Sequence, residues 1–178
     1  MDHLMVLTKK QLLASLSSSV LFVGFGNICR SPMAEAIFKN MLAKISLEDK
    51  WRVDSAGVGT WYIGRDPDPR AIKILQLWKF PIQRKARQVN DEDFHRFDHI
   101  LAMDDDDLRH LERMAPPSST AKRGLLGAYD PLGEVFIEDP FYTRGEKPFQ
   151  TIMNQCLRCC EGFLVSSVLK GSETVSVS

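Results

Sequence analysis

The chain of 178 residues lacks any apolar run near the roughly 20 residues that a helix needs to cross a bilayer. It also lacks an excess of either charge, because 23 basic and 23 acidic side chains balance. Bulk charge therefore favours neither nucleic acid nor an anionic membrane as a partner, and we expect a monomer that binds neither. No internal repeat or low-complexity block divides the chain, and its length suits one compact domain.

Cysteine is scarce, and three of the four cysteines lie together in the segment QCLRCC at 155–160. A zinc site would require a second cluster of ligands, and none with suitable spacing occurs, so we expect no metal. We interpret the cysteines as small buried apolar residues in a reducing compartment, which favours the cytoplasm. A redox or metal protein built on Cys156, Cys159 and Cys160 is the alternative.

Neither end of the chain has the pattern of a folded element. Residues 1–19 make a poor signal peptide, because the lysines follow the first apolar stretch. A mitochondrial presequence is the less favoured alternative, since the segment is Ser-rich but has no Arg. We expect a partly helical or frayed arm over 1–19, a folded domain over 20–170 and a disordered tail over 171–178.

Between the two ends, short apolar runs alternate with helical patterns. The run Val20–Val23 predicts a strand that is buried on both faces. Further strands are expected over 52–56, 99–103 and around 125–126, and helices from 31, over 69–78, near 90–97, from 104 and over 149–164. Asp104–Asp107 would supply acidic residues to a first helical turn, where the helix dipole favours them. This alternation predicts a three-layer α/β fold, with about four parallel strands and helices on both faces of the sheet.

The loop after the first strand carries the most specific chemistry. Its residues 24–30 connect a strand to a helix N-terminus, where backbone N–H groups can form a nest for an anion. Gly26 and Asn27 are residue types that accept left-handed backbone angles, and Arg30 offers a planar fork for two oxygens. The Gly-Lys-Ser/Thr ending of a Walker A loop is missing, and a dinucleotide fingerprint is absent too. These features favour a phosphate-binding loop over an ordinary turn.

The stretch VGFGNICRSPMAE at 23–35 resembles the signature V-C-x-G-N-I-C-R-S-P-x-A-E of low-molecular-weight protein tyrosine phosphatases. Every named position matches except the first cysteine, where this chain has Gly24. The resemblance continues in collinear order over about residues 20–165, through WRVDSAG at 51–57, FDHILAMD at 97–104, LLGAYDP at 125–131 and EDPFY at 138–142.

The resemblance implies a role for each matching residue. In the family a cysteine thiolate attacks phosphorus, and water then hydrolyses the phosphocysteine; Gly24 occupies that position and has no side chain. Arg30 is implied to bind phosphate and stabilise the transition state, and Asp139 to act as general acid. No cofactor is implied, and the expected partners are a phosphotyrosine protein or peptide, inorganic phosphate or sulfate. The implied binding residues are Phe25, Gly26, Asn27, Ile28, Cys29, Ser31, Trp61, Phe141 and Tyr142, with Ser55 as support.

Gly24 changes the expectation for Cys29, and Arg84 is one further departure from the family pattern. Cys29 matches a second loop cysteine that can form a protective disulfide with the nucleophile in the family, and without that partner we expect an inert packing residue. Arg84 stands where some relatives have a histidine, and an Arg84–Glu35 ion pair is a plausible replacement.

Three interpretations of Gly24 stay open. The chain is a natural pseudophosphatase that binds phosphotyrosine without turnover, an active phosphatase whose nucleophile was substituted in this copy, or an enzyme in which Asp139 activates water directly. Engineered inactivation usually uses Ser or Ala, which favours a natural glycine. We therefore predict phosphate and phosphotyrosine binding with impaired catalysis, with the substituted active phosphatase as the alternative. The codon at position 24 in the source genome distinguishes these two.

Overall fold

The structure, a computed structural model, describes residues 17–173. Most of the expected N-terminal arm (1–16) and part of the expected tail (174–178) lie outside the described residues. Both expected boundaries of the folded domain, at residues 20 and 170, move outward. The first strand begins at Ser18, and the last helix continues through Glu173. Ser18 pairs with Trp51, and the Ser19 hydroxyl donates to Asp98 at 2.8 Å, which joins these two serines to the sheet.

A parallel sheet of four strands forms the centre of the fold, as predicted. The strands are β1 (Ser18–Gly24), β2 (Trp51–Gly57), β3 (His99–Ala102) and β4 (Lys122–Leu125), in the order β2-β1-β3-β4. Val20–Val23 are fully buried, as expected for a strand covered on both faces. The fourth strand, expected around 125–126, includes Leu125 but begins earlier, at Lys122, and Leu126 begins a 3₁₀ helix, η2 (Leu126–Tyr129).

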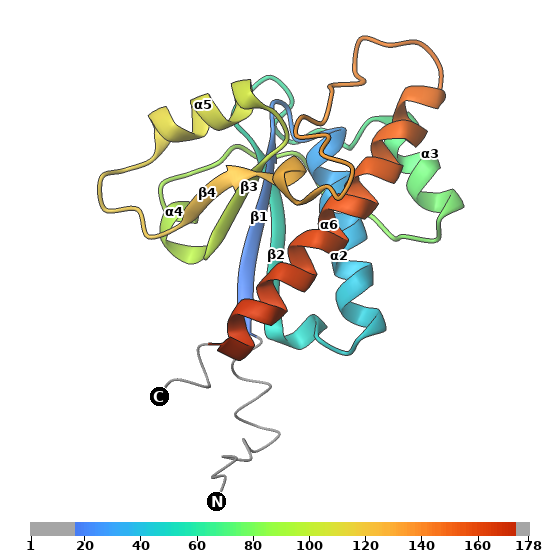
Figure 1. The fold of residues 1–178 in the computed structure, drawn as a ribbon. Coiled ribbons are helices and arrows are strands. Elements are labelled where there is room, and N and C mark those ends of the chain that lie inside the picture. The colour runs from blue at the N-terminus through green and yellow to red at the C-terminus, as the bar shows by residue number, and fades with distance from the viewer. Residues whose placement is uncertain (1–16, 174–178) are drawn as a thin grey trace, which may run out of the picture.

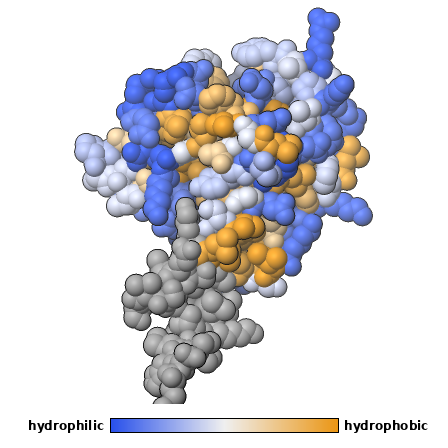
Figure 2. Space-filling view, viewed as in Figure 1, coloured by the Kyte–Doolittle hydropathy of each residue, from blue (hydrophilic) through white to orange (hydrophobic). Residues whose placement is uncertain are grey.

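Helices cover both faces of this sheet and complete the three layers (Figure 1). One layer contains α2 (Arg30–Lys44), α3 (Pro69–Leu77) and α6 (Lys147–Glu173), which pack on one another. The other contains α4 (Asp93–Arg96) and α5 (Asp105–Met114), and α5 contacts β3 and β4. A 3₁₀ turn, η1 (Glu48–Lys50), leads into β2. Figure 2 shows hydrophilic residues gathered over the α5 side of the molecule.

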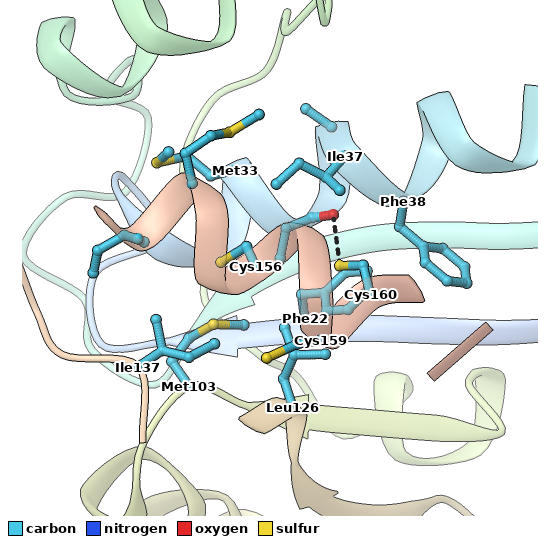
Figure 3. Close-up of a cluster of buried hydrophobic side chains, with 14 of the residues drawn as sticks. Phe22, Met33, Ile37, Phe38, Met103, Leu126, Ile137, Cys156, Cys159 and Cys160 are labelled. Carbon is cyan, nitrogen blue, oxygen red and sulfur yellow. Dashed lines mark hydrogen bonds between the residues drawn. The ribbon is translucent and has the colours of Figure 1, made fainter. Parts of the chain in front are cut away.

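The crowded cysteines lie inside the larger hydrophobic core (Figure 3). Cys156, Cys159 and Cys160 of α6 are completely buried beside α2, and the Cys160 thiol contacts the carbonyl of Ala34 at 3.8 Å. Burial raises the pKa of Cys159 to about 12 and raises those of Cys156 and Cys160 as well. Their interpretation as buried apolar residues is confirmed. No group of three His, Cys, Asp or Glu residues within 17–173 is arranged to hold a metal ion.

The carboxyl end of β1 lies where the strand order reverses, because β2 pairs on one side of β1 and β3 on the other. Ligands of open α/β sheets bind at such a point. The Met103 N–H donates to the Val23 carbonyl, and Ile137 N–H donates to the Met103 carbonyl, both within 3.0 Å. These bonds bring the segments after β3 and before Asp139 beside the loop that follows β1. Across the described part of the chain, no helix is long and apolar enough to cross a membrane.

Candidate active site

A pocket of about 70 Å³ opens at the carboxyl end of β1. It brings together the whole predicted loop with residues from two distant segments: Gly24, Phe25, Gly26, Asn27, Ile28, Cys29, Arg30, Ser31, Tyr62, Asp139, Phe141 and Tyr142. A larger cavity of about 280 Å³ lies at the amino ends of the strands, beside Trp51 and His99, and none of the predicted site residues lines it. Most of the predicted site residues therefore converge on the smaller pocket.

Local backbone geometry shapes the loop as a potential anion nest. Gly24 ends β1, and its carbonyl accepts the Val58 N–H at 3.0 Å. Asn27 adopts a φ of 57°, the left-handed conformation that its residue type allows, whereas Gly26 does not have a positive φ. The first turn of α2 has no side-chain cap and no acidic residue, whereas Asp68 and Asp104 cap α3 and α5. The N-terminal N–H groups and the positive end of the α2 dipole thus lie at the floor of the pocket.

The Asn27 side chain holds this left-handed turn from beneath. Its amide nitrogen donates to the hydroxyls of Ser31 at 3.1 Å and Ser55 at 2.9 Å. Its amide oxygen accepts from the Arg84 guanidinium and the Arg87 N–H, both at 3.0 Å. All four hydrogen-bonding positions of the buried amide are therefore used, which fixes the turn. Ser55, predicted as support, lies beneath the loop and not in the pocket.

Arg84 pairs with Glu35, as predicted, and reaches further than the sequence indicated. The same guanidinium contacts Asp54 at 2.9 Å, the Ser55 hydroxyl at 2.7 Å and Asn27. Glu35 in turn accepts the Ser55 hydroxyl at 2.7 Å. The Arg84 side chain thus connects the α2 carboxylate with the β2 end and the loop by using several donors at once.

Arg30 projects from the first turn of α2 into a group of three carboxylates. Its Nη1 donates to Asp104 at 2.6 Å and to the Ile137 carbonyl at 2.9 Å. Its Nη2 lies 3.3 Å from Asp139 and 3.2 Å from Asp107. Burial opposes the charged guanidinium, but the Asp107, Asp139 and Asp104 carboxylates outweigh it and raise the pKa of Arg30. Arg30 is therefore a fixed positive charge in the wall of the pocket.

Asp139 and two aromatic residues form part of the pocket rim. One Asp139 oxygen accepts the Phe141 N–H at 3.1 Å, and the other contacts Arg30. The Phe141 ring packs against Tyr142 at 4.9 Å and Tyr62 at 5.5 Å between centroids. Tyr142 is 90% exposed, so its ring extends from the rim into solvent.

The aromatic wall differs from the sequence prediction at one position. Trp61 is 73% exposed and stacks on Phe25, but it does not line the pocket. Its neighbour Tyr62 lines the pocket instead. A Cβ at Gly26 would lie 2.6 Å from the Tyr62 ring, so glycine there permits the close approach of the ring. The adjacent aromatics Trp61 and Tyr62 were the only sequence signal, and they do not reveal which ring turns inward.

Cys29 lines the pocket but is poorly suited to act as a nucleophile. Its thiol is buried, and burial together with the Asp68 and Asp139 carboxylates raises its pKa well above the ordinary range. Arg70 and Arg30 lower the pKa by less. A thiol that stays protonated does not attack phosphorus at neutral pH.

The chain matches a family model described as low molecular weight phosphotyrosine protein phosphatase over residues 19–174, and it belongs to this family. The pig protein of that name is 45% identical over 150 residues, which cover 83% of this chain and 94% of the relative. The Drosophila melanogaster low molecular weight phosphotyrosine protein phosphatase 2 is 44% identical over 157 residues, with 88% and 96% covered.

Two solved structures illustrate the likeness of the fold. A Drosophila arginine phosphatase superposes with a TM-score of 0.79 at 42% identity, covering 83% of this chain and 96% of that one. A tyrosine phosphatase from Entamoeba histolytica with Hepes in its active site superposes with a TM-score of 0.81 at 31% identity, covering 88% and 99%. The family and the three-layer fold predicted from the sequence are thereby confirmed.

Proposed function

We propose that this chain captures phosphorylated ligands, phosphotyrosine above all, and hydrolyses them very slowly. The observation that carries the proposal is Gly24 at the nucleophile position of an otherwise complete loop around one pocket. A dianion would be attracted by the uncapped N-terminus of α2, by the backbone N–H groups of the loop and by Arg30. A catalytic thiolate would repel that dianion, and glycine brings no such charge.

The rim supports an aromatic phosphoester as ligand. Tyr62, Phe141 and Tyr142 surround the opening, and their rings can pack against a tyrosyl ring whose phosphate reaches the loop. The bound Hepes of the Entamoeba neighbour carries a sulfonate, which is an oxyanion of similar shape. The Drosophila neighbour is an arginine phosphatase, so phosphoarginine is a competing ligand to compare directly.

Calorimetry on the folded protein tests this proposal. A phosphotyrosine peptide and inorganic phosphate should bind, and the unphosphorylated peptide should not. Arg30→Lys keeps a positive charge among the carboxylates but loses the planar fork, so affinity should fall by about tenfold or more. Arg109→Lys on the exposed face of α5 is the matched control and should leave affinity unchanged. Absence of phosphate and peptide binding at millimolar concentration and low salt would falsify the proposal.

The alternative is an active phosphatase whose nucleophile was substituted in this copy. The proposal and this alternative share the pocket and the ligand. They differ in whether the protein encoded by the natural gene turns the ligand over. Removing a covalent nucleophile costs roughly 10⁴- to 10⁶-fold in turnover, so the chain as given should scarcely hydrolyse p-nitrophenyl phosphate. Turnover within tenfold of an ordinary family member would mean that another group, such as water activated by Asp139, takes over. The cytoplasmic location and the monomeric state stay predictions.

A further inference from the structure

Asp107 is the carboxylate at Arg30 that the fold isolates most from water. Its side chain is 3% exposed, against 26% for Asp104 and 37% for Asp139. Asp104 is compensated by the Asp107 N–H at 2.8 Å and by Arg30 Nη1, and Asp139 by the Phe141 N–H, by a hydrogen bond from Arg30 Nη2 at 3.3 Å and by solvent. Asp107 Oδ2 has only the ion-pair distance of 3.2 Å to Arg30 Nη2 and no aligned hydrogen bond among the described residues.

The charges around Asp107 oppose its ionisation. Burial raises the pKa of Asp107 to about 7; the Arg30 charge lowers it, and the carboxylates of Asp104 and Asp139 raise it again. These groups come from three segments of the chain: Arg30 from α2, Asp104 from the start of α5, and Asp139 from the segment before α6. Asp107 is therefore balanced between its two protonation states near neutral pH, and the Arg30 cation favours the ionised form.

An oxyanion in the pocket would disturb this balance. It would share the Arg30 guanidinium with the carboxylates and add up to two negative charges beside them. Asp107, which has no solvent to compensate it, loses the most from that change. We propose that Asp107 is a positioning residue that competes with a bound oxyanion for Arg30 Nη2, so that the oxyanion binds together with one proton that Asp107 takes up from solvent.

The proposal rests on the oxyanion binding proposed above, and it assigns to that site a dependence on pH. The proton adds to a carboxylate oxygen of Asp107, and no other bond forms or breaks. Binding raises the proton affinity of Asp107. The affinity for the anion must therefore fall as pH rises above the pKa of Asp107 in the unliganded protein. Below about pH 7 the proton is already present, and Asp107 adds no pH dependence there.

Sulfate is the appropriate probe, because it stays a dianion across this range whereas phosphate itself titrates. Calorimetry should show sulfate affinity about tenfold weaker at about pH 8 than at about pH 6 in the unchanged protein. Asp107→Asn, which has nearly the same shape without the charge, should bind equally well at both pH values. Asp106→Asn, on the exposed face of the same turn, is the matched control and should keep the dependence of the unchanged protein.

Proton counting separates competition from a structural role. Repeating the titrations at about pH 8 in buffers of different ionisation enthalpy should reveal uptake of nearly one proton per sulfate in the unchanged protein and in Asp106→Asn. Asp107→Asn should take up almost none. If Asp107→Asn does not fold, proton uptake by the unchanged protein alone tests the inference.

Several results would overturn the inference. One is sulfate binding without proton uptake in the unchanged protein, and another is an undiminished pH dependence in Asp107→Asn. A loss of affinity that is equal at both pH values in Asp107→Asn would indicate a structural role only. In each of these cases the oxyanion site itself stands. If sulfate binds to none of the proteins at either pH, both the inference and the proposed function fail.

Discussion

Restoring a cysteine at position 24 should convert this chain into a working phosphatase. A Cβ built on Gly24 meets the Ser31 hydroxyl oxygen at 3.5 Å and Met103 Cγ at 3.6 Å, which are ordinary van der Waals contacts. The φ angle of Gly24 is not positive, so a side chain brings no backbone strain. Replacing glycine at such a site also reduces the freedom of the unfolded chain, which favours stability by about 0.4–1 kcal/mol. Gly24→Cys should therefore fold as well as the unchanged protein.

The gain in turnover follows from the chemistry of the pocket. A thiol at the end of β1 would lie beside the α2 N-terminus, whose dipole and N–H groups favour the thiolate. We expect turnover of p-nitrophenyl phosphate to rise by on the order of 10⁴- to 10⁶-fold, with a trappable phosphocysteine. Gly24→Ser and Gly24→Ala are matched controls, because both add the Cβ without a thiol. A folded Gly24→Cys variant no faster than Gly24→Ala would refute the reasoning.

Three further predictions concern the loop, the cysteines and an ion pair. Asn27→Ala should lower the free energy of unfolding in urea by about 1–3 kcal/mol. Asn27→Gly should lower it less, because glycine accepts the φ of 57° without strain and alanine does not. Equal losses of stability in the two variants would contradict this. A thiol reagent at pH 8 should label none of the four cysteines in folded protein and all four in guanidinium, because all are buried with raised pKa values; rapid labelling of the folded protein would show an exposed thiolate. Hydrogen bonds from Arg158 lower the pKa of Asp130 in the folded protein. The pair therefore stabilises the fold at pH values above the pKa of Asp130 in the unfolded chain, and this stabilisation is lost as pH falls through its pKa in the folded protein. Asp130→Asn should thus unfold more easily at pH 7 and approach the unchanged protein below about pH 4, and a gap that persists in acid would argue against it.

The general acid assignment needs the restored nucleophile before it can be measured. In the Gly24→Cys background, Asp139→Asn should slow hydrolysis of a substrate with a poor leaving group by roughly 10²- to 10⁴-fold. The effect should shrink for p-nitrophenyl phosphate, whose leaving group requires little protonation. The comparison of the two substrates is the measurement, and an equal loss on both would show that Asp139 acts in another way.

Much of the fold could be predicted because its signals are local. The apolar run at Val20–Val23 indicates a strand buried on both faces, and the alternation with helices requires parallel crossovers. The left-handed turn at Asn27 follows from its residue type, so it too was predictable. The short fourth strand begins earlier than expected, because Lys122–Leu125 carries little apolar pattern and depends on its pairing with β3.

By itself the sequence determined the family, the parallel sheet and the loop around Gly24, since these depend on spacing along the chain. Only the tertiary structure decided which ring enters the pocket and what surrounds Arg30. Asp104–Asp107 are four similar acids at the start of α5, yet the fold buries Asp107 beside the Arg30 guanidinium and leaves Asp106 in water. Burial and the field of neighbouring charges arise from segments far apart in sequence, and those two quantities decide how a carboxylate behaves.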